Sequence, residues 1–529
     1  MKIPSFLAIF LALGPSISLA AQAPSTIAAD TTWTAAQGPY EVTGTTTVSE
    51  GATLTVEAGT TVVMGKDAGL LVQGQLIARG TQASPVLFVP AQDGDPPVRW
   101  GAVTFEPTSI PATFEQVDQY ASGSVLEWCV LEGASHAVRL IGASPYISSC
   151  TFRGNRTPLS LDVVGGAALL IENGSAPRIR DCRFEDNFAD GFNYGGAVYV
   201  DSSAPILQDN VFVGNTAIYG GGLCTTLVAS PIVGNRFEGN VATGSEDNSK
   251  GGGMSLISTI SAVLNNTVTK NESGGDGAGI HVCVDCHPHA TPFLMDNTVT
   301  QNSAATSDPS HAAGGIGAAF LRILTSNNIH GNTRGGEPSE FGWFHPVDEG
   351  FPDWVANVSI AGNWWGTADT AAIDAVVANG QPVDGAGSAN PHPALSAPVE
   401  APTPRVTLAT RRLRYDEEAQ EMGVFLTLYN PGAARSFELH ILLRYEGGPS
   451  FPYILPLGLP EETVEGGTHR FSMPEDSVWF STLAAPSYDP TRRMGGGGSW
   501  SAALHDPEDG AIIGVPCSSR FLLNEEVVP

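Results

Sequence analysis

Charged residues are scarce in this sequence. Asp, Glu, Lys and Arg make up 15% of the 529 residues, against roughly 25% in an average globular protein. Basic residues are the scarcer kind, with 25 Lys and Arg against 54 Asp and Glu, for a formal net charge of −29. Because a negative field repels phosphate backbones and anionic lipid, the composition argues against nucleic acid and acidic membrane surfaces as partners.

Helical periodicity and long hydrophobic runs are also lacking. In the repeated central region, no segment keeps apolar residues at helical spacing over several turns. Beyond the extreme N-terminus, no apolar run approaches the roughly 20 residues that cross a bilayer as a helix. We therefore expect an all-β chain without a transmembrane segment.

Cysteine is rare, with seven residues in the chain. A chain of this length does not need a disulfide framework, and an odd number leaves at least one thiol free or paired outside the chain in an oxidising compartment. Cys129, Cys150 and Cys182 fall at one position of the repeat described below. We interpret these three as a buried stack of unreactive thiols.

Residues 1–20 have the features of a secretory signal peptide. Lys2 is the only charge, an apolar run extends from Phe6 to Leu13, and small residues end at Ala20. No cysteine stands at the cleavage point, which argues against a lipid anchor. We predict cleavage after Ala20 and a secreted protein, either extracellular or on the outer cell surface.

Glycine, proline and an internal repeat are abundant, with 61 Gly and 38 Pro. Tetrapeptides of the type Phe184–Asn187 recur every 25 to 32 residues, and their final residues are Asn155, Asn187, Asn215, Asn240, Asn271, Asn302 and Asn332. Between them lie Gly-rich segments that precede an apolar residue, beginning at Gly195, Gly220, Gly251 and Gly277. Each period also contains a small residue, often followed by Pro, before a third apolar run.

Each period thus holds three short β-type runs separated by turns. Such strands cannot bury an apolar face alone, but coils stacked about 4.8 Å apart pair every strand above and below. We expect a parallel β-helix with an N-terminal cap over residues 24–390, with a short helix over 370–378 covering its open end. Like side chains then form ladders, and we expect an amide ladder from Asn210, Asn235, Asn266 and Asn297.

The alternation of Phe-x-x-Asn with Gly-Gly-Ala-Val tetrapeptides resembles the repeat of polymorphic outer-membrane proteins. The opening stretch and the segment Asn363–Thr367 (Asn-Trp-Trp-Gly-Thr) resemble bacterial secreted proteins of the pectate-lyase-like right-handed parallel β-helix superfamily. The resemblance covers roughly residues 33–390 and implies a fold, not an activity, because that superfamily includes lyases, hydrolases, esterases, adhesins and scaffolds. The C-terminal segment Glu525–Pro529 lacks the aromatic residue that closes the barrel of polymorphic outer-membrane proteins.

The pattern changes after residue 390. Residues 391–404 are rich in Pro and Ala and predict a semi-rigid linker. In residues 405–529, apolar residues alternate with polar ones, as in Phe437–Tyr445, and turn-forming clusters recur. This pattern predicts a β-sandwich, which could bind a ligand, dock to a surface or dimerise.

Loops between each Asn and the next Gly-rich segment are expected to stack along one side of the β-helix, where insertions usually form the binding face. The candidate glycan- or calcium-binding residues there are Asp190, Tyr194, Tyr219, Asp247, Lys250, Glu272 and Asp276. Carboxylates with tyrosines along a surface could bind a sugar chain, with or without Ca²⁺, which prefers oxygen ligands. The alternative is that these are solvated turn residues. Residues 333–357 are expected to leave the coil as an aromatic loop that either stacks on sugars or covers the core.

No pattern singles out a catalytic set. Lys250 and Lys270 lie near acidic loops and could act as the base of a lyase. The favoured hypothesis is a non-catalytic binding or adhesion scaffold that presents an acidic loop face to a polysaccharide or a cell-surface component. The alternative is a polysaccharide lyase or glycoside hydrolase acting on an acidic polysaccharide.

The segment Cys283-Val284-Asp285-Cys286-His287 matches the pattern that attaches haem. His281 and His289 lie close by. A local disulfide or plain turn is the favoured interpretation, and a Cys₂His₂-like metal site is the other alternative to haem.

Overall fold

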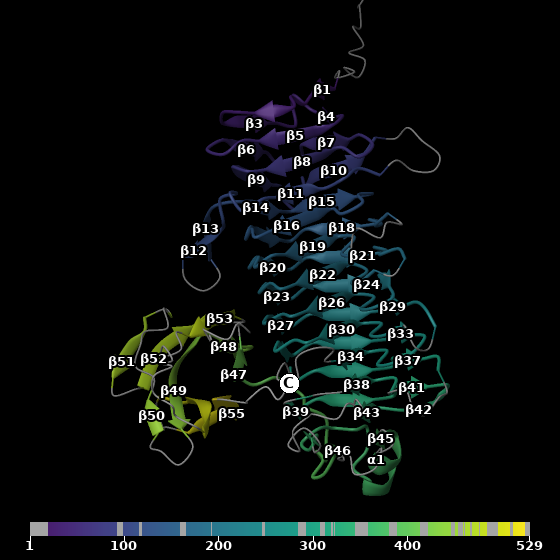
Figure 1. The fold of residues 1–529 in the computed structure, drawn as a ribbon, viewed down its shortest axis with the longest axis vertical. Coiled ribbons are helices and arrows are strands. Elements are labelled where there is room, and N and C mark those ends of the chain that lie inside the picture. Colours follow the sequence, from purple (N-terminus) through teal and green to yellow (C-terminus); the bar gives the residue numbers. More distant parts are fainter. Residues whose placement is uncertain are drawn as a thin grey trace, which may run out of the picture.

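The computed structural model describes residues 20–91, 99–115, 119–158, 165–191, 193–245, 249–283, 292–306, 313–318, 321, 323–343, 358–379, 389–412, 422–445, 450–452, 459, 461–465, 468–474, 477–483, 496–507 and 511–523. These residues form a long β-solenoid with a smaller antiparallel unit beside its lower half (Figure 1). Among them, no helix has the length and apolar character needed to span a bilayer.

Three long parallel sheets, called A, B and C, form the solenoid, and each coil passes through them in that order. Sheet A contains β1 (Ala21–Gln22), β4 (Tyr40–Val42), β7 (Thr61–Met64), β10 (Val86–Pro90), β15 (Cys129–Glu132), β18 (Thr151–Arg153), β21 (Arg183–Glu185), β24 (Val211–Val213), β28 (Arg236–Glu238), β32 (Thr267–Thr269), β36 (Thr298–Thr300) and β40 (Asn328–His330). Sheet B contains β2 (Thr26–Ile27), β5 (Thr45–Val48), β8 (Gly69–Val72), β11 (Val103–Phe105), β16 (Val138–Ile141), β19 (Leu169–Glu172), β22 (Val198–Asp201), β26 (Leu223–Thr226), β30 (Met254–Ile257), β34 (Ile280–Cys283), β38 (Ile316–Ala318), β43 (Phe341–Trp343) and β45 (Val377–Asn379). Sheet C contains β3 (Thr31–Trp33), β6 (Thr53–Val56), β9 (Gln75–Arg79), β14 (Val125–Glu127), β17 (Tyr146–Ser148), β20 (Arg178–Arg180), β23 (Ile206–Gln208), β27 (Pro231–Val233), β31 (Ala262–Leu264), β35 (Phe293–Met295) and β39 (Ile323–Thr325). The expectation of three strand runs per coil is confirmed.

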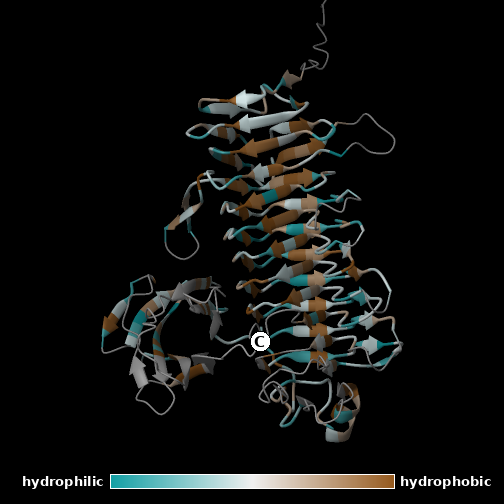
Figure 2. Cartoon of the chain, in the orientation of Figure 1, coloured by the Kyte–Doolittle hydropathy of each residue, from teal (hydrophilic) through white to brown (hydrophobic). Residues whose placement is uncertain are grey.

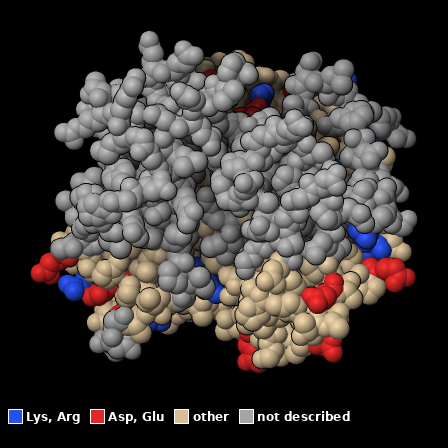
Figure 3. Space-filling model, turned by 60° about the horizontal axis from the view of Figure 1, so that its bottom comes forward, with Lys and Arg blue, Asp and Glu red and all other residues tan. Residues whose placement is uncertain are grey.

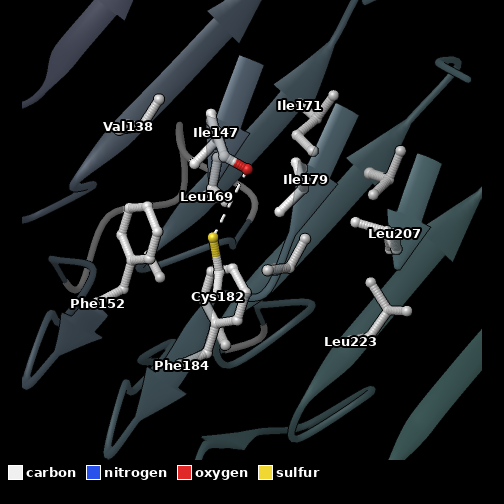
Figure 4. Close-up of a cluster of buried hydrophobic side chains, with 14 of the residues drawn as sticks. Val138, Ile147, Phe152, Leu169, Ile171, Ile179, Cys182, Phe184, Leu207 and Leu223 are labelled. Atoms are coloured by element: carbon white, nitrogen blue, oxygen red, sulfur yellow. Dashed lines mark hydrogen bonds between the residues drawn. The ribbon is translucent and has the colours of Figure 1, made fainter. Parts of the chain in front are cut away.

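The core fills the inside of the coil with stacked like residues. Alternate residues of each strand point inward and are mostly apolar. The strands are accordingly banded with hydrophobic and hydrophilic residues (Figure 2). The rings of Phe152, Phe184, Phe212 and Phe237 stack with centroids 4.4 to 4.9 Å apart. Around them, aliphatic residues from sheets B and C close the interior (Figure 4).

An amide ladder lies at the corner between sheets C and A, as expected. From Asn210 to Asn363, each side-chain Nδ2 donates to Oδ1 of the next rung at 2.8 to 3.0 Å. Cysteines continue the ladder upward, since the Cys182 backbone N–H donates to Asn210 Oδ1 at 2.9 Å. Burial raises the pKa of the Cys129 and Cys182 thiols, whereas at Cys150, between them, burial is outweighed by hydrogen bonds with both neighbours, which lower the pKa.

A second amide ladder, which the repeat analysis did not anticipate, follows sheet A. It connects Asn155 to Asn332 with Nδ2–Oδ1 distances of 2.8 to 2.9 Å. Glu340 ends it in place of a further Asn and accepts from the Asn332 Nδ2 at 2.6 Å and from the Gly331 N–H at 2.8 Å. Glu340 is buried, which raises the pKa of its carboxyl.

Short strands form a fourth parallel stack, sheet D, where loops were expected. Sheet D contains β25 (Thr216–Ala217), β29 (Val241–Ala242), β33 (Glu272–Ser273), β37 (Ser303–Ala304), β41 (Thr333–Arg334) and β42 (Glu337–Pro338), of which β41 and β42 are antiparallel. The expectation that residues 333–357 leave the coil as one loop was wrong for residues 333–343, which contain β41, β42 and β43 (Phe341–Trp343). Strand β43 continues sheet B between β38 and β45, because inward Phe341 supplies the apolar residue that the rung requires.

The lower end of the solenoid carries the expected short helix, α1 (Thr370–Val376). Asp369 caps it by accepting from the Ala372 N–H at 2.9 Å. The helix is two residues shorter than expected, because residues from Val377 onward pair with β43. Nearby, β44 (Val358–Ser359) pairs with β46 (Ala389–Asn390).

Two antiparallel sheets form the C-terminal unit, as the alternating pattern predicted. One contains β47 (Arg405–Arg412), β48 (Met422–Asn430) and β53 (Ser477–Leu483). The other contains β49 (Arg435–Tyr445), β50 (Ser450–Pro452), β51 (Thr463–Glu465), β52 (Thr468–Met473), β54 (Gly496–His505) and β55 (Ile512–Leu523). Leu426 and Leu428 of the first sheet share a core with Phe437, Leu439 and Ile441 of the second, which is a sandwich arrangement.

The sandwich packs against the outer face of sheet C. Outward-facing Val233, Leu264 and Met295 of the solenoid belong to the same buried cluster as the sandwich core. A fully buried ion pair joins the two units, with Arg405 Nε and Nη2 donating to the two carboxylate oxygens of Asp296 at 2.5 and 2.6 Å. Higher on the same face lies the hairpin β12 (Thr113–Glu115) and β13 (Gln119–Ser122) (Figure 1).

Candidate functional site

Four of the candidate residues form one column at the corner that leads into sheet B. Tyr194, Tyr219, Lys250 and Asp276 come from successive coils and pair by parallel β-bridges in that order. Neighbouring rungs of a parallel stack lie about 4.8 Å apart. The coil therefore brings together side chains that are separated by up to 82 positions in the sequence.

The glycine after each column residue explains why the chain turns there. Gly195 and Gly220 have φ of 63° and 66°, a left-handed conformation that side chains disfavour. A Cβ at Gly220 would also collide with the carbonyl oxygen of Leu223. These corners consequently require glycine, and the preceding residue is held at the edge of sheet B.

A second column runs beside the first on the outer face of sheet B. Register pairs Tyr199 with Cys224, Cys224 with Ser255, and Ser255 with His281. All four point away from the core and are nevertheless buried. We call the two columns together the sheet B cluster, which comprises Tyr194, Tyr199, Tyr219, Cys224, Lys250, Ser255, Asp276 and His281.

Tyrosines dominate the upper part of the sheet B cluster. The rings of Tyr194 and Tyr199 stack at 5.5 Å, and Tyr194 lies 5.1 Å from Tyr219. Burial raises the pKa of Tyr199, whose hydroxyl lies 3.4 Å from Thr226 Oγ1. Tyr194 and Tyr219 remain half-buried, in contrast to the buried Tyr199.

Polar groups dominate the lower part. Lys250 Nζ lies 3.6 Å from Asp276 Oδ2, and their side chains are 22% and 6% exposed. Ser255 Oγ lies 3.1 Å from His281 Nδ1. Burial, and then the charge of Lys250, hold the pKa of His281 well below its usual value, so this imidazole is neutral at neutral pH.

Other candidate residues lie apart from the sheet B cluster. Asp190 forms an ion pair with Arg156, whose Nη2 lies 2.6 Å from Asp190 Oδ2. Glu272 is exposed on sheet D. Lys270, the other candidate base, lies between β32 of sheet A and β33 of sheet D. Its Nζ pairs with Glu238 Oε1 at 3.3 Å. Asp247 lies outside the described residues.

The haem-like motif is only partly described. Cys283 ends β34, where it is in register with Ile257 on the outer side of sheet B, whereas Cys286, His287 and His289 lie outside the described residues. In the described part of the chain, no group of three or more His, Cys, Asp or Glu residues could hold a metal ion. Asp276 is the one carboxylate in the sheet B cluster, while Ca²⁺ takes six to eight oxygen ligands.

Sequence reasoning missed Tyr199, Cys224 and Ser255, and it noted His281 only as a neighbour of the haem-like motif. The available signal was strand alternation: each is the second residue of its sheet B strand, after an inward apolar residue, and must point outward. Their burial could not be read from that alternation, because it depends on what covers the face.

Two family models match the solenoid. The model described as a pectate-lyase like beta helix domain matches residues 25–107, and that of the right handed beta helix region matches residues 117–258. Among solved structures, the enzymatically active domain of tailspike protein 4 of bacteriophage CBA120 aligns at 10% identity with a TM-score of 0.23, over 94% of this chain and 64% of that chain. This chain thus spans less than two thirds of that structure. No curated protein matches.

The family models and the three stacked parallel sheets together define the class of the solenoid. It is a right-handed parallel β-helix, as the sequence resemblance implied, and the pectate-lyase like model covers its residues 25–107. The likeness to polymorphic outer-membrane proteins stays a prediction.

Proposed function

We propose that this is a secreted glycan-binding protein whose ligand lies along the outer side of sheet B, against Tyr194, Tyr219, Lys250 and Asp276. The observation that carries the proposal is the alignment of these four side chains in one column. A column of side chains on consecutive rungs offers contacts to successive units of an extended polymer.

The chemistry of the column suits sugars. Partly exposed tyrosine rings offer apolar faces, each with a hydroxyl group at the edge. Lys250, whose side chain is 22% exposed, can donate hydrogen bonds to sugar hydroxyls next to the rings, while the more deeply buried Asp276 pairs with it. The pectate-lyase-like name of the family model for residues 25–107 is in keeping with a polysaccharide ligand.

The proposal includes export. Residues 1–20 have the composition of a signal peptide, and the strongly acidic chain suits a soluble extracellular protein. The expected location is the extracellular medium or the outer cell surface, with a polysaccharide or another surface component as partner.

The test uses mature protein that begins at Ala21. Affinity electrophoresis through gels containing individual polysaccharides would measure retention of the wild type, Tyr219→Ala and Tyr120→Ala. Tyr120 is the matched control, because it is a half-buried tyrosine on the hairpin over sheet C. Retention that Tyr219→Ala weakens and Tyr120→Ala leaves intact is expected. Absence of retention on every polysaccharide would contradict the proposal.

A second candidate is a polysaccharide lyase or glycoside hydrolase. It is favoured by the grouping of Lys250, Asp276 and neutral His281, since a base needs such neighbours to tune proton transfer. Release of unsaturated or reducing ends from the same polysaccharides, with and without Ca²⁺, tests it. Lys250→Ala should abolish such release, whereas Lys270→Ala should not, because Lys270 lies outside the sheet B cluster.

A further inference from the structure

Basic side chains of the described solenoid are mostly matched by a carboxylate. On sheet B itself, Arg139 Nε lies 2.9 Å from Glu172. At the neighbouring corner, Arg156 pairs with Asp190 at 2.6 Å, and on sheet A Arg236 pairs with Glu238 at 2.6 Å. In Figure 3, blue basic atoms lie beside red acidic ones at the left and right edges, while other red groups near the bottom stand alone.

The sheet B cluster follows this rule. Lys250 carries the one positive charge of the sheet B cluster. The carboxylate of Asp276 lies 3.6 Å from it and is more deeply buried. His281 adds no charge at neutral pH, because burial and Lys250 lower its pKa. The charges of the described cluster therefore cancel.

A polyanion would need the opposite arrangement. Each carboxylate or sulfate brought against the cluster loses water and requires a cation that is not already neutralised. To serve that role, Lys250 would have to give up its ion pair with the buried carboxylate of Asp276, which is unfavourable. The net charge of −29 adds a repulsion that salt screens beyond about 8 Å at physiological ionic strength.

We infer that the ligand of the sheet B cluster is an uncharged polysaccharide, recognised by stacking on the tyrosine rings and by hydrogen bonds that Lys250 donates to its hydroxyl groups. This inference rests on the proposed glycan-binding function and names the substrate class. It differs from the alternative hypothesis drawn from the sequence, in which an enzyme acts on an acidic polysaccharide.

The experiment compares polymers that share a backbone and differ in charge. The pairs are hydroxyethyl cellulose with carboxymethyl cellulose, dextran with dextran sulfate, and fully methyl-esterified with de-esterified polygalacturonan. Binding of full-length mature protein is measured at about 0.01 and 1 M NaCl, where the Debye length is about 30 and 3 Å. The uncharged member of at least one pair should bind about tenfold more tightly than its charged counterpart, with an affinity that salt does not change.

Asp276→Asn sharpens the test by freeing the charge of Lys250. This variant should gain about tenfold in affinity for the charged polymer, and the gain should vanish at high salt. Glu272→Gln is the matched control, because it also removes one negative charge but on exposed sheet D, and it should change nothing. If Asp276→Asn does not fold, the wild-type comparison alone decides.

Equal or tighter binding of the charged members, weakened by salt, would overturn this inference and leave glycan binding standing. Retention of no polymer at all would overturn the proposed function itself.

Discussion

The outer faces of sheets B and C belong to the same solenoid and have the same rung geometry, yet they carry different surfaces. On sheet C, outward positions such as Val233, Leu264 and Met295 are apolar and the sandwich covers them. On sheet B, the corresponding outward positions hold Tyr199, Ser255 and His281. The difference teaches that the repeat builds the frame, whereas the outward residues decide whether the covered face is apolar, as on sheet C, or polar, as on sheet B.

Breaking the interface between sheet C and the sandwich should have the largest effect on stability. Asp296→Ala leaves Arg405 as a buried cation without its ion-pair partner, which typically costs about 3–5 kcal/mol. We expect the sandwich to undock, which limited proteolysis and differential scanning calorimetry would detect. The double variant Asp296→Leu with Arg405→Met should recover most of the loss, because it removes both charges. An unchanged protease pattern in Asp296→Ala would contradict the assigned interface.

A substitution at a corner of sheet B should lower stability less than the loss of the Asp296–Arg405 ion pair. Gly220→Ala places a Cβ at φ 66° against the Leu223 carbonyl, and backbone strain of this kind costs about 1–3 kcal/mol. Displacement of Tyr219 should also weaken glycan retention. Gly239→Ala is the matched control, since its φ is 63° but nothing lies within 4 Å of the added Cβ. Equal losses of stability and retention in both variants would show that the collision is unimportant.

The end of the second ladder should respond to pH. Burial raises the folded-state pKa of Glu340 above its ordinary value of 4.5. Its contribution to stability is therefore full below pH 4.5 and is lost as pH rises through the folded pKa. Chemical unfolding from pH 4 to 8 should show this loss in the wild type.

Glu340→Gln removes the titrating group and should lack that part of the pH dependence. Because both Glu and Gln offer an oxygen to Asn332, the substitution should lower the free energy of unfolding at low pH by only about 1–2 kcal/mol. Identical pH profiles for the two proteins would contradict the raised pKa.

The smallest effect is expected inside the sheet B cluster. Ser255→Ala removes one hydrogen bond to His281, worth about 1 kcal/mol. Thermal unfolding and polysaccharide release should both be measured. A loss of stability without any change in product release supports a structural role for the pair, whereas abolished release would favour the enzymatic candidate.

Much of the fold could be predicted from the spacing of a few residue types. The recurrence of Asn210, Asn235 and Cys182 at one position of the repeat predicted the first ladder. A buried turn in each coil needs a side chain that can hydrogen-bond to the same position in the next coil. Sheet D was missed because strands of two residues, such as Glu272–Ser273, carry no periodic signal. The candidate site was half predicted: Tyr194, Tyr219, Lys250 and Asp276 were chosen as loop residues, but nothing in the local pattern separated them from Asp190 or Glu272.

By itself, the sequence determined the period, the inward apolar residues and the glycines at the corners. These features act between neighbouring coils, through strand pairing and through the backbone conformation of single residues. Only the tertiary structure decided which polar residues share a column, that Lys250 is neutralised by Asp276, and that Asp296 faces Arg405 across 109 positions. Those outcomes depend on the exact number of residues in each coil and on what packs over each face, because charge and burial are properties of neighbours in space.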